Sequence, residues 1–260
     1  MRSLPTTDFT TVTEAPGDAL RHEALEMLWT RYAFAAEYCR DRHVLEVACG
    51  AGQGLGLLAR TAARVVGGDC TERLLGFAKQ HYGSRIPLVR LDGQQLPFHD
   101  ATFDVVLLYE AVYYLPEPAL FLEECRRVLR PGGRVLLCTA NKGLADFNPS
   151  PFHRRYFSGA ELIDLFRRHR FDPVLLGAFP VAQETTRNRI VSLIKRTAVA
   201  LHLVPKTMRG KALLKRLFFG PLEAAPAELS GEWRNHRPQV VPSGTGADRY
   251  RVLFVDATVG

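Results

Sequence analysis

A glycine-rich run follows a short apolar segment in the first fifth of the chain. Residues 44–59 read VLEVACGAGQGLGLLA, with Glu46 inside the apolar part and Gly50, Gly52 and Gly54 in the turn after it. Glycines let the backbone approach a ligand closely at the carboxyl end of a buried strand, where open parallel sheets bind nucleotides. The dinucleotide-binding pattern GxGxxG is not met, because Leu55 stands where the third glycine is needed. Glu46 also suits a cationic ligand better than a pyrophosphate.

Two further acids close the apolar segments that come next. Asp69 follows residues 64–68, and a carboxylate at that strand end can accept hydrogen bonds from both hydroxyls of a ribose. Asp92 follows residues 87–91, where it can accept a hydrogen bond from an exocyclic amine, with the Gly93 amide beside it. The acids at three strand ends therefore predict one ligand site at the edge of a parallel sheet.

Apolar segments and helical patterns alternate between residues 43 and 139, which is typical of strand and helix units that form a mostly parallel sheet. The pattern predicts strands over 44–48, 64–68, 87–91, 103–109 and 134–139, and helices over 52–62, 71–82 and 118–129. Several strands are almost wholly apolar, as expected when helices cover both faces. Further on, Ser158 and Glu161 have the spacing of a capping box that opens a helix ending near Arg168, and strands are expected over 171–181 and 249–259.

In order and spacing these motifs resemble those of the class I S-adenosylmethionine-dependent methyltransferases, within their small-molecule, ubiquinone-type group. The resemblance is firm over residues 43–139 and looser to the C-terminus. It implies an α/β, doubly wound, seven-stranded, mostly parallel sheet of Rossmann-like form with the last strand antiparallel. The implied cofactor is S-adenosyl-L-methionine. The residues expected to bind it are Tyr32, Glu46, Ala48, Gly50, Gly52, Asp69, Cys70, Asp92, Gly93 and Tyr109.

The resemblance also divides these residues between the two ends of the cofactor. Glu46, Gly50 and Gly52 would surround the methionine part, and Tyr109 would touch it from the end of the fourth strand. Asp69 would hold the ribose, Cys70 would pack on the adenine, and Asp92 with Gly93 would read the adenine edge. Ala48 replaces the glycine most often seen first in the motif, and Cys70 replaces a more usual aliphatic residue. Arg31 and Tyr32 lie on an expected N-terminal helix. Either both residues cap the carboxylate of the cofactor, or Arg31 is solvated and Tyr32 packs in the core.

The chemistry implied by this cofactor requires few catalytic groups from the protein. A sulfonium methyl group is already electrophilic, so the protein must align a nucleophile, exclude water and remove a proton where the nucleophile carries one. For an oxygen nucleophile, a general base would contribute about 10²- to 10⁴-fold. Candidates near the strand ends are Glu110, Tyr113, Tyr114 and His153. The alternatives are aromatic packing for the tyrosines and a solvated loop position for His153.

The net charge of +7 is concentrated in one segment. Between Glu184 and Glu223 there are nine basic residues and no acid, so the rest of the chain has a charge of −2. Basic and apolar residues interleave there as in two amphipathic helices. These helices could form a lid over the substrate pocket, could contact an anionic membrane surface through residues 187–219, or could bind RNA. Nucleic acid is the least favoured of the three.

The amino-acid composition limits the class of protein, its metal content and its location. Hydrophobic residues make up 47% and charged residues 23%, as in an ordinary globular chain. Five cysteines without a CxxC pair indicate buried thiols and argue against a zinc site or a disulfide framework, so no metal is expected. No apolar run reaches the ~20 residues of a membrane-spanning helix, and the polar N-terminus lacks a signal-peptide core. We expect a cytoplasmic protein, with peripheral membrane contact as an open alternative.

The expected organisation has four parts: an N-terminal helical lid (1–42), a cofactor-binding α/β core (43–183), a basic helical insertion (184–247) and the final strand (248–260). The expected function is methyl transfer from S-adenosylmethionine to oxygen, nitrogen or carbon of a small or lipid-linked metabolite. The alternatives are an RNA methyltransferase, a cofactor-sensing protein without turnover, and a nicotinamide-dependent dehydrogenase. Neither the acceptor nor the oligomeric state can be read from the sequence.

Overall fold

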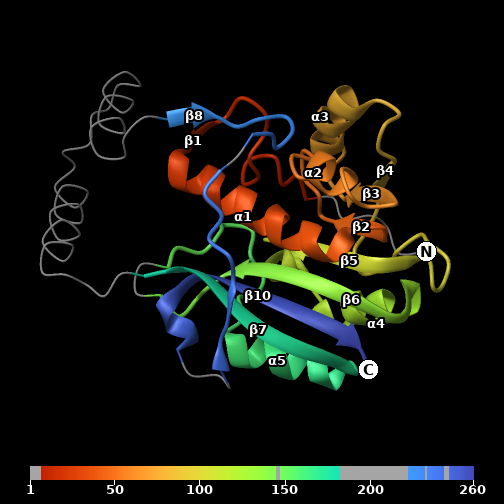
Figure 1. The fold of residues 1–260 in the computed structure, drawn as a ribbon, viewed down its shortest axis with the longest axis vertical. Coiled ribbons are helices and arrows are strands. Elements are labelled where there is room, and N and C mark those ends of the chain that lie inside the picture. Colours follow the sequence, from red (N-terminus) through yellow and green to blue (C-terminus); the bar gives the residue numbers. More distant parts are fainter. Residues whose placement is uncertain (1–6, 145–146, 182–221, 232, 243–245) are drawn as a thin grey trace, which may run out of the picture.

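The computed structural model describes residues 7–144, 147–181, 222–231, 233–242 and 246–260 (Figure 1). Its centre is an eight-stranded sheet in the order β4-β3-β2-β5-β6-β10-β7-β9. The strands are β2 (His43–Val47), β3 (Arg64–Asp69), β4 (Leu88–Arg90), β5 (Phe103–Tyr109), β6 (Leu129–Ala140), β7 (Phe171–Pro180), β9 (Gln239–Val240) and β10 (Tyr250–Val259).

Strand directions follow the doubly wound pattern. From β4 to β6, neighbouring strands pair in parallel, whereas β10 pairs antiparallel with both β6 and β7. This confirms the predicted fold of a mostly parallel sheet whose last strand is antiparallel. The difference from prediction is β9, a two-residue strand that adds to the edge beside β7.

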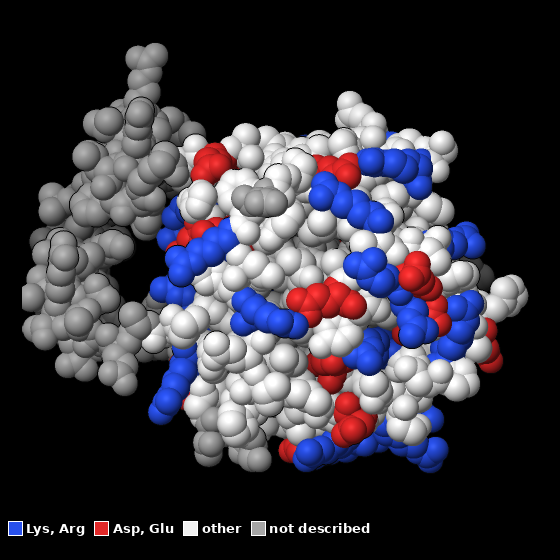
Figure 2. All heavy atoms as spheres, in the orientation of Figure 1, with Lys and Arg blue, Asp and Glu red and all other residues white. Residues whose placement is uncertain are grey.

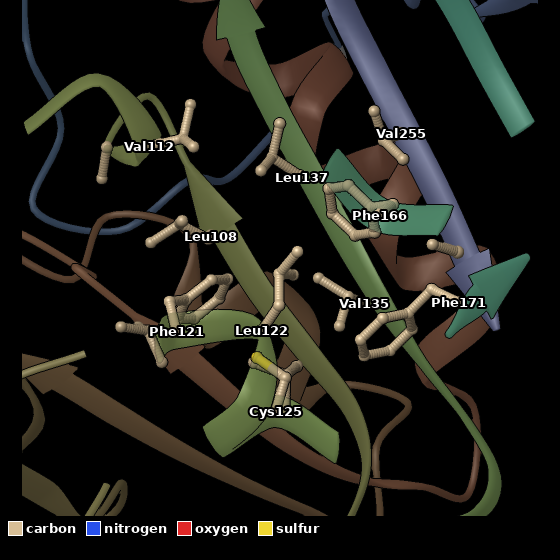
Figure 3. Packing of buried hydrophobic residues seen from close by; sticks show 14 of the residues in the cluster. Leu108, Val112, Phe121, Leu122, Cys125, Val135, Leu137, Phe166, Phe171 and Val255 are labelled. Atoms are coloured by element: carbon tan, nitrogen blue, oxygen red, sulfur yellow. The ribbon is translucent and has the colours of Figure 1, made fainter. Parts of the chain in front are cut away.

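Helices cover both faces of the sheet. On one face lie α1 (His22–Cys39), α2 (Leu55–Ala59) and α3 (Glu72–Tyr82), and on the other lie α4 (Pro118–Val128) and α5 (Gly159–Arg168). Along β5, alternate residues belong to alternate cores, with Leu107 packed on the α1 side and Leu108 on the α4 side. Figure 3 shows α4 and α5 side chains packed against β5, β6 and β10. The almost wholly apolar β5 is therefore explained by burial on both faces.

Local sequence signals place most helix ends correctly. In the capping box of α5, the Ser158 hydroxyl accepts a hydrogen bond from the Glu161 amide at 3.3 Å, and the Glu161 carboxylate accepts one from the Ser158 amide at 2.7 Å. The prediction for 52–62 is too long, because α2 begins only at Leu55. Gly50 and Gly52 have φ angles of +57° and +78°, which keep the preceding loop out of the helix.

The described part of the predicted insertion returns to the core. The strand β8 (Leu222–Ala224) pairs antiparallel with β1 (Ala19–Arg21) just before α1. Downstream of β8, the Leu229 amide donates a hydrogen bond to the Gln53 carbonyl at 2.8 Å, next to the glycine loop. Residues 222–231 and 233–242 thus run across the α1 side of the molecule and reach the sheet edge as β9 (Figure 1).

The basic residues of the predicted lid or membrane helices, Arg187 to Arg216, lie outside the described residues. Over the described surface in Figure 2, basic and acidic side chains are interspersed. None of the helices in the described ranges combines the length and apolar character needed to cross a bilayer.

Candidate functional site

The carboxyl ends of β2, β3 and β5 open into a cleft of about 1090 Å³. Ligand pockets usually measure about 300–1,000 Å³, so this cleft has room for two small molecules side by side. It is lined by Tyr32, Ala48, Gly50, Asp69, Cys70, Asp92, Gly93, Tyr109, Glu110, Tyr113, Tyr114 and His153, together with Arg31. The structure therefore brings together all but two of the predicted site residues. Glu46 and Gly52 do not line the cleft.

The glycine loop after β2 is held by an acid from β3. One oxygen of Asp69 accepts a hydrogen bond from the Gly50 amide at 2.9 Å, and the other accepts one from the Thr71 amide at 2.7 Å. Burial raises the pKa of Asp69, and these backbone donors oppose that rise. Asp69 thus holds the glycine loop in place by these hydrogen bonds, and it also lines the cleft.

Ala48 has a φ of +58°, in the left-handed region that favours glycine. This conformation costs a residue with a side chain about 1–2 kcal/mol. The alanine noted at this position is therefore accommodated at a cost, and the turn keeps its shape.

Glu46 lies behind the loop, with only 1% of its surface exposed. The Tyr32 hydroxyl donates a hydrogen bond to its Oε1 at 2.5 Å, while its Oε2 has no partner among the described residues. Burial raises the pKa of Glu46 to about 8, against the opposing effect of the Tyr32 hydrogen bond. Burial therefore favours the protonated form of Glu46, which supports the loop from behind.

Gly52 also has a structural explanation. A Cβ atom at Gly52 would come within 2.9 Å of the Ala78 Cβ on α3. The Gly52 carbonyl also accepts a hydrogen bond from the Tyr82 hydroxyl at 2.8 Å. Gly54 is constrained in a similar way, because a Cβ atom there would overlap the Tyr32 ring. These two glycines serve the packing of α1 and α3 on the loop.

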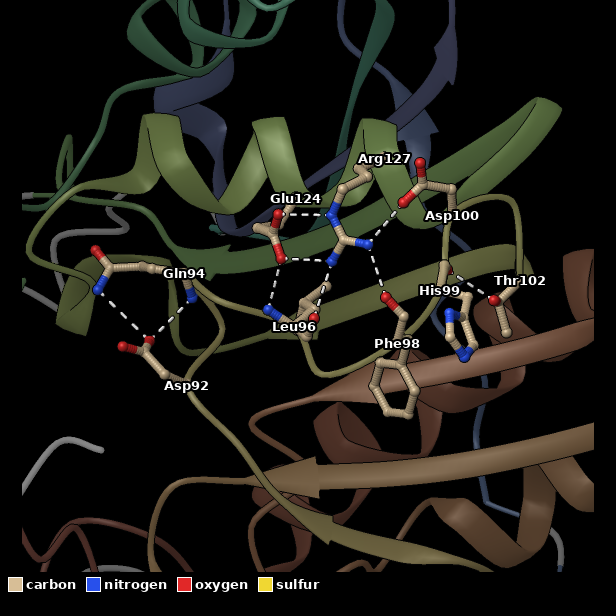
Figure 4. Close-up of polar contacts among 9 residues, drawn as sticks. All are labelled: Asp92, Gln94, Leu96, Phe98, His99, Asp100, Thr102, Glu124 and Arg127. Atoms are coloured by element: carbon tan, nitrogen blue, oxygen red, sulfur yellow. Dashed lines mark hydrogen bonds and ion pairs between the residues drawn. The ribbon is translucent and has the colours of Figure 1, made fainter. Parts of the chain in front are cut away.

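The loop after β4 carries Asp92 and is tied down at its far end (Figure 4). The Asp92 Oδ1 accepts a hydrogen bond from the Gln94 amide at 2.9 Å. Further along, the Arg127 guanidinium of α4 donates to the Leu96 carbonyl at 2.9 Å and to the Phe98 carbonyl at 2.7 Å. Arg127 is in turn bound to both oxygens of Glu124 and to Asp100. This network anchors the loop to α4.

Glu110, directly after β5, has a φ of +50°, and strained backbone of this kind clusters at functional sites. Its carboxylate accepts hydrogen bonds from the Arg31 guanidinium at 2.8 Å, the Tyr113 hydroxyl at 3.1 Å and the Ala140 amide at 3.2 Å. Through these hydrogen bonds, Glu110 acts as an anchor for Arg31 and Tyr113.

The remaining catalytic candidates lie in an aromatic region. Burial raises the pKa of Tyr113, whose ring stacks on Tyr156 at 4.3 Å between ring centroids. The Tyr114 hydroxyl bonds to the Ser150 hydroxyl at 2.8 Å. His153 Nδ1 lies 2.6 Å from the Ser150 carbonyl oxygen, so Nδ1 donates this hydrogen bond.

The sequence did not reveal several residues that line the cleft, notably Phe9, Thr13, Phe147, Phe152 and Arg154. They come from the N-terminal segment and from the loop after β6, neither of which carries a recognisable motif. The only available signal was the presence of phenylalanines in otherwise polar, proline-containing segments.

Comparisons with known proteins agree with this geometry. A family model described as a methyltransferase domain matches residues 45–137. A protein of Mycolicibacterium smegmatis named a probable S-adenosylmethionine-dependent methyltransferase is 36% identical over 58% of this chain and 58% of its own length. A ubiquinone biosynthesis O-methyltransferase of Cereibacter sphaeroides is 30% identical over 54% of this chain and 68% of its own length.

The match to the first of these relatives thus spans less than two thirds of that protein. Among solved structures, a methyltransferase from Thermotoga maritima described as a possible histamine N-methyltransferase superposes with a TM-score of 0.59. That superposition covers 91% of this chain and 92% of the other, at 15% identity. At this identity the likeness concerns the fold alone.

Proposed function

The chain belongs to the class I S-adenosylmethionine-dependent methyltransferases, and on that premise we propose that it transfers the methyl group of S-adenosylmethionine to a small or lipid-linked acceptor. The single observation that carries the proposal is the cleft itself. It joins the Gly50 loop, the Asp69 carboxylate and Asp92, all at strand ends, to a second region with room for another molecule.

The residues present suit this cofactor. Tyr109 Oη and Arg31 Nε belong to residues that line the cleft, yet both atoms are buried without a hydrogen-bond partner among the described residues. Buried polar atoms normally have partners, so these are available to a ligand with polar groups. Asp92 Oδ2 accepts none of the hydrogen bonds found in the described ranges, which leaves it for an adenine amine.

When bound, the cofactor would supply an electrophilic methyl group. We assign Asp69 to the ribose, Cys70, Asp92 and Gly93 to the adenine, and Tyr109 and Arg31 to the methionine part. At Ala48 and Gly50 the backbone would approach the cofactor closely. Glu46 and Gly52 lie behind the glycine loop and hold its shape, and Tyr32, which lines the cleft, donates a hydrogen bond to Glu46.

Proton removal is best assigned to His153 among the four candidates. The carboxyl group of Glu110 already accepts hydrogen bonds from three donors, and burial disfavours the phenolate of Tyr113 by raising its pKa. Tyr114 is bonded to Ser150. The Nε2 atom of His153 is free to accept a proton from an acceptor hydroxyl, because the carbonyl of Ser150 fixes the tautomer.

We keep the acceptor class broad, as oxygen, nitrogen or carbon of a small or lipid-linked molecule. The O-methyltransferase of ubiquinone biosynthesis supports an acceptor of this kind. Peripheral membrane contact through residues 187–219 and a cytoplasmic location remain part of the proposal. Both the membrane contact and the RNA alternative rest on the basic sequence alone, since that segment lies outside the described residues.

The test is an incubation of the full chain with methyl-labelled S-adenosylmethionine and a metabolite extract, followed by mass spectrometry. We expect S-adenosylhomocysteine to accumulate together with one product heavier by a labelled methyl. Parallel thermal unfolding should show stabilisation by S-adenosylhomocysteine and none by NAD. Stabilisation by NAD alone would indicate a dehydrogenase, and cofactor binding without any labelled product would indicate a sensor protein.

A further inference from the structure

Three aromatic side chains from three separate segments meet at one end of the cleft. Phe9 lies in the N-terminal segment, Tyr114 in the 3₁₀ turn after β5, and Phe152 in the loop after β6. The Phe9 ring lies 4.8 Å from that of Tyr114 and 6.1 Å from that of Phe152, between centroids. We call these three residues the aromatic wall.

The aromatic wall keeps apolar surface open to the cleft. Phe152 is 39% exposed, which makes it one of the few large apolar side chains at the described surface. Phe9 and Tyr114 are only partly buried. Apolar surface at the mouth of a cleft is stabilised when a ligand covers it, so the wall is suited to binding.

The wall is held in position from behind. Tyr114 is fixed by its hydrogen bond to Ser150 and by the neighbouring ring of Tyr113, whose centroid lies 4.5 Å away. Tyr113 in turn stacks on Tyr156, and the Tyr156 hydroxyl accepts a hydrogen bond from the Ser150 amide at 3.0 Å. A prearranged surface of this kind loses little freedom on binding, which favours a rigid ligand.

The wall stands on the acceptor side of the cleft. Its residues follow β5 and β6 or come from the N-terminal segment, whereas Asp69 is the last residue of β3, on the other side of β2. Strands lie about 4.8 Å apart, so the ends of β3 and β6 are separated by three spacings, about 14 Å. His153, the candidate proton acceptor, belongs to the same loop as Phe152 and also lines the cleft.

Charge on this side argues against a cationic acceptor. Apart from Asp69 and Asp92, the acids that line the cleft are Glu14 and Glu110, and Glu110 is paired with Arg31. The cationic side chains lining the cleft are Arg21, Arg31, Arg154 and Arg251. Aromatic rings can also bind cations, but the Arg154 guanidinium beside the wall would repel a bound cation.

Resting on the proposed function, we propose that Phe9, Tyr114 and Phe152 form the acceptor subsite and that they select a flat aromatic acceptor that is neutral or anionic. The ring lies against the wall, and its nucleophilic atom points toward the cofactor side. Phe9 and Phe152 are specificity-determining residues, and the N-terminal segment is therefore part of the enzyme's substrate site.

The test uses four bicyclic probes of matched size with the full chain saturated in S-adenosylhomocysteine. The probes are 2-naphthol, 2-naphthoate, 2-naphthylmethylamine and decahydro-2-naphthol, with binding measured by calorimetry. We expect the naphthol and the naphthoate to bind, and both the amine and the saturated alcohol to bind at least tenfold more weakly. Preference for the amine or for the saturated alcohol would overturn the proposal.

Variants separate the aromatic ring from general hydrophobicity. Phe152→Leu and Phe9→Leu should each weaken 2-naphthol by about three- to tenfold, whereas Phe152→Tyr should retain its affinity. Val240→Ala, an exposed apolar residue on β9, serves as the control and should have no effect. Equal affinity in Phe152→Leu and wild type would contradict the role of the wall.

The cofactor readout distinguishes the two proposals. The affinity for S-adenosylhomocysteine should be the same in wild type, Phe152→Leu and Phe9→Leu. Intact cofactor binding with the wrong probe preference overturns only the aromatic subsite. Failure of the wild-type chain to bind S-adenosylhomocysteine overturns the proposed function, and the subsite with it.

Discussion

The two sides of the cleft are built in different ways. The side formed by β2, β3 and β4 is polar, and its contacts are short-range: Asp69 bonds to the Gly50 loop, and Asp92 bonds to Gln94 two residues on. The acceptor side is aromatic and combines the N-terminal segment with two loops far away in sequence. The first side suits a ligand with many hydrogen-bonding groups, and the second suits a ligand that is selected by its shape.

This difference between the two sides indicates which part of such a protein can vary in sequence. Strand ends in a parallel sheet are fixed relative to one another by the hydrogen-bond ladder, so polar groups placed there keep their geometry. Loops and termini are less constrained by the sheet, and they can be changed without loss of the cofactor site. Four variants test this division, from the largest expected effect to the smallest.

Asp69→Ala should abolish measurable binding of S-adenosylhomocysteine, a loss of 100-fold or more in affinity, because the variant removes the proposed ribose contact and releases the Gly50 amide. Binding is measured by calorimetry, with circular dichroism to confirm the fold. Asp92→Asn serves as a milder comparison on the same side. Retained affinity in Asp69→Ala would remove Asp69 from the cofactor site.

Glu46→Gln should change the pH dependence of stability. The folded-state pKa of Glu46 is about 8, above its unfolded value of about 4.3, so the folded chain holds a proton that the unfolded chain releases between these pH values. The free energy of unfolding of the wild type therefore falls as pH rises through this window, by up to about 1.4 kcal/mol per unit relative to Glu46→Gln.

Urea unfolding at pH 5, 6, 7 and 8 measures this difference. The control is Glu37→Gln, an exposed acid on the same helix as Tyr32. A constant difference between Glu46→Gln and wild type across the four pH values would show that Glu46 is ionised in the folded state.

Arg127→Ala should destabilise the chain by about 2 kcal/mol, because it leaves the Leu96 and Phe98 carbonyls without this donor and removes the ion pair with Glu124. Urea unfolding measures the loss, and hydrogen exchange at the Leu96 amide should speed up as the loop after β4 loosens. Arg126→Ala, the neighbouring residue on α4, is the control. Unchanged exchange at Leu96 would show that the network does not hold this loop.

Tyr114→Phe should have the smallest effect. The variant removes the hydrogen bond to Ser150 at 2.8 Å but keeps the ring. We expect the affinity for 2-naphthol to fall by no more than about threefold and that for S-adenosylhomocysteine to stay constant, in a calorimetric titration. A larger loss for the cofactor than for the naphthol would place Tyr114 on the cofactor side.

The sequence predicted the polar residues that line the cleft because its signals there are local. A glycine turn after a buried strand and acids at Asp69 and Asp92 are readable from spacing, since each strand end is defined by its own apolar segment. The roles of Glu46 and Gly52 were less accessible, because only packing shows that Tyr32 and Tyr82 lie against them.

The acceptor side was not readable for the opposite reason. Tyr113, Tyr114 and His153 were expected near the site, but Phe9 and Phe152 are brought there by contacts across more than a hundred residues of sequence. The return of residues 222–231 and 233–242 over α1 was missed as well, since a two-residue strand such as β9 has no periodicity to detect. Tertiary contacts of this kind leave no local pattern.

The measurement that tests the account most directly is a crystal structure of the full chain with S-adenosylhomocysteine and 2-naphthol. The account predicts the ribose on Asp69, the adenine beside Asp92, and the naphthol ring against Phe9 and Phe152 with its hydroxyl facing the cofactor sulfur. Adenine bound against Phe9 and Phe152, or the naphthol bound outside the cleft, would contradict the division of the cleft into a polar cofactor side and an aromatic acceptor side.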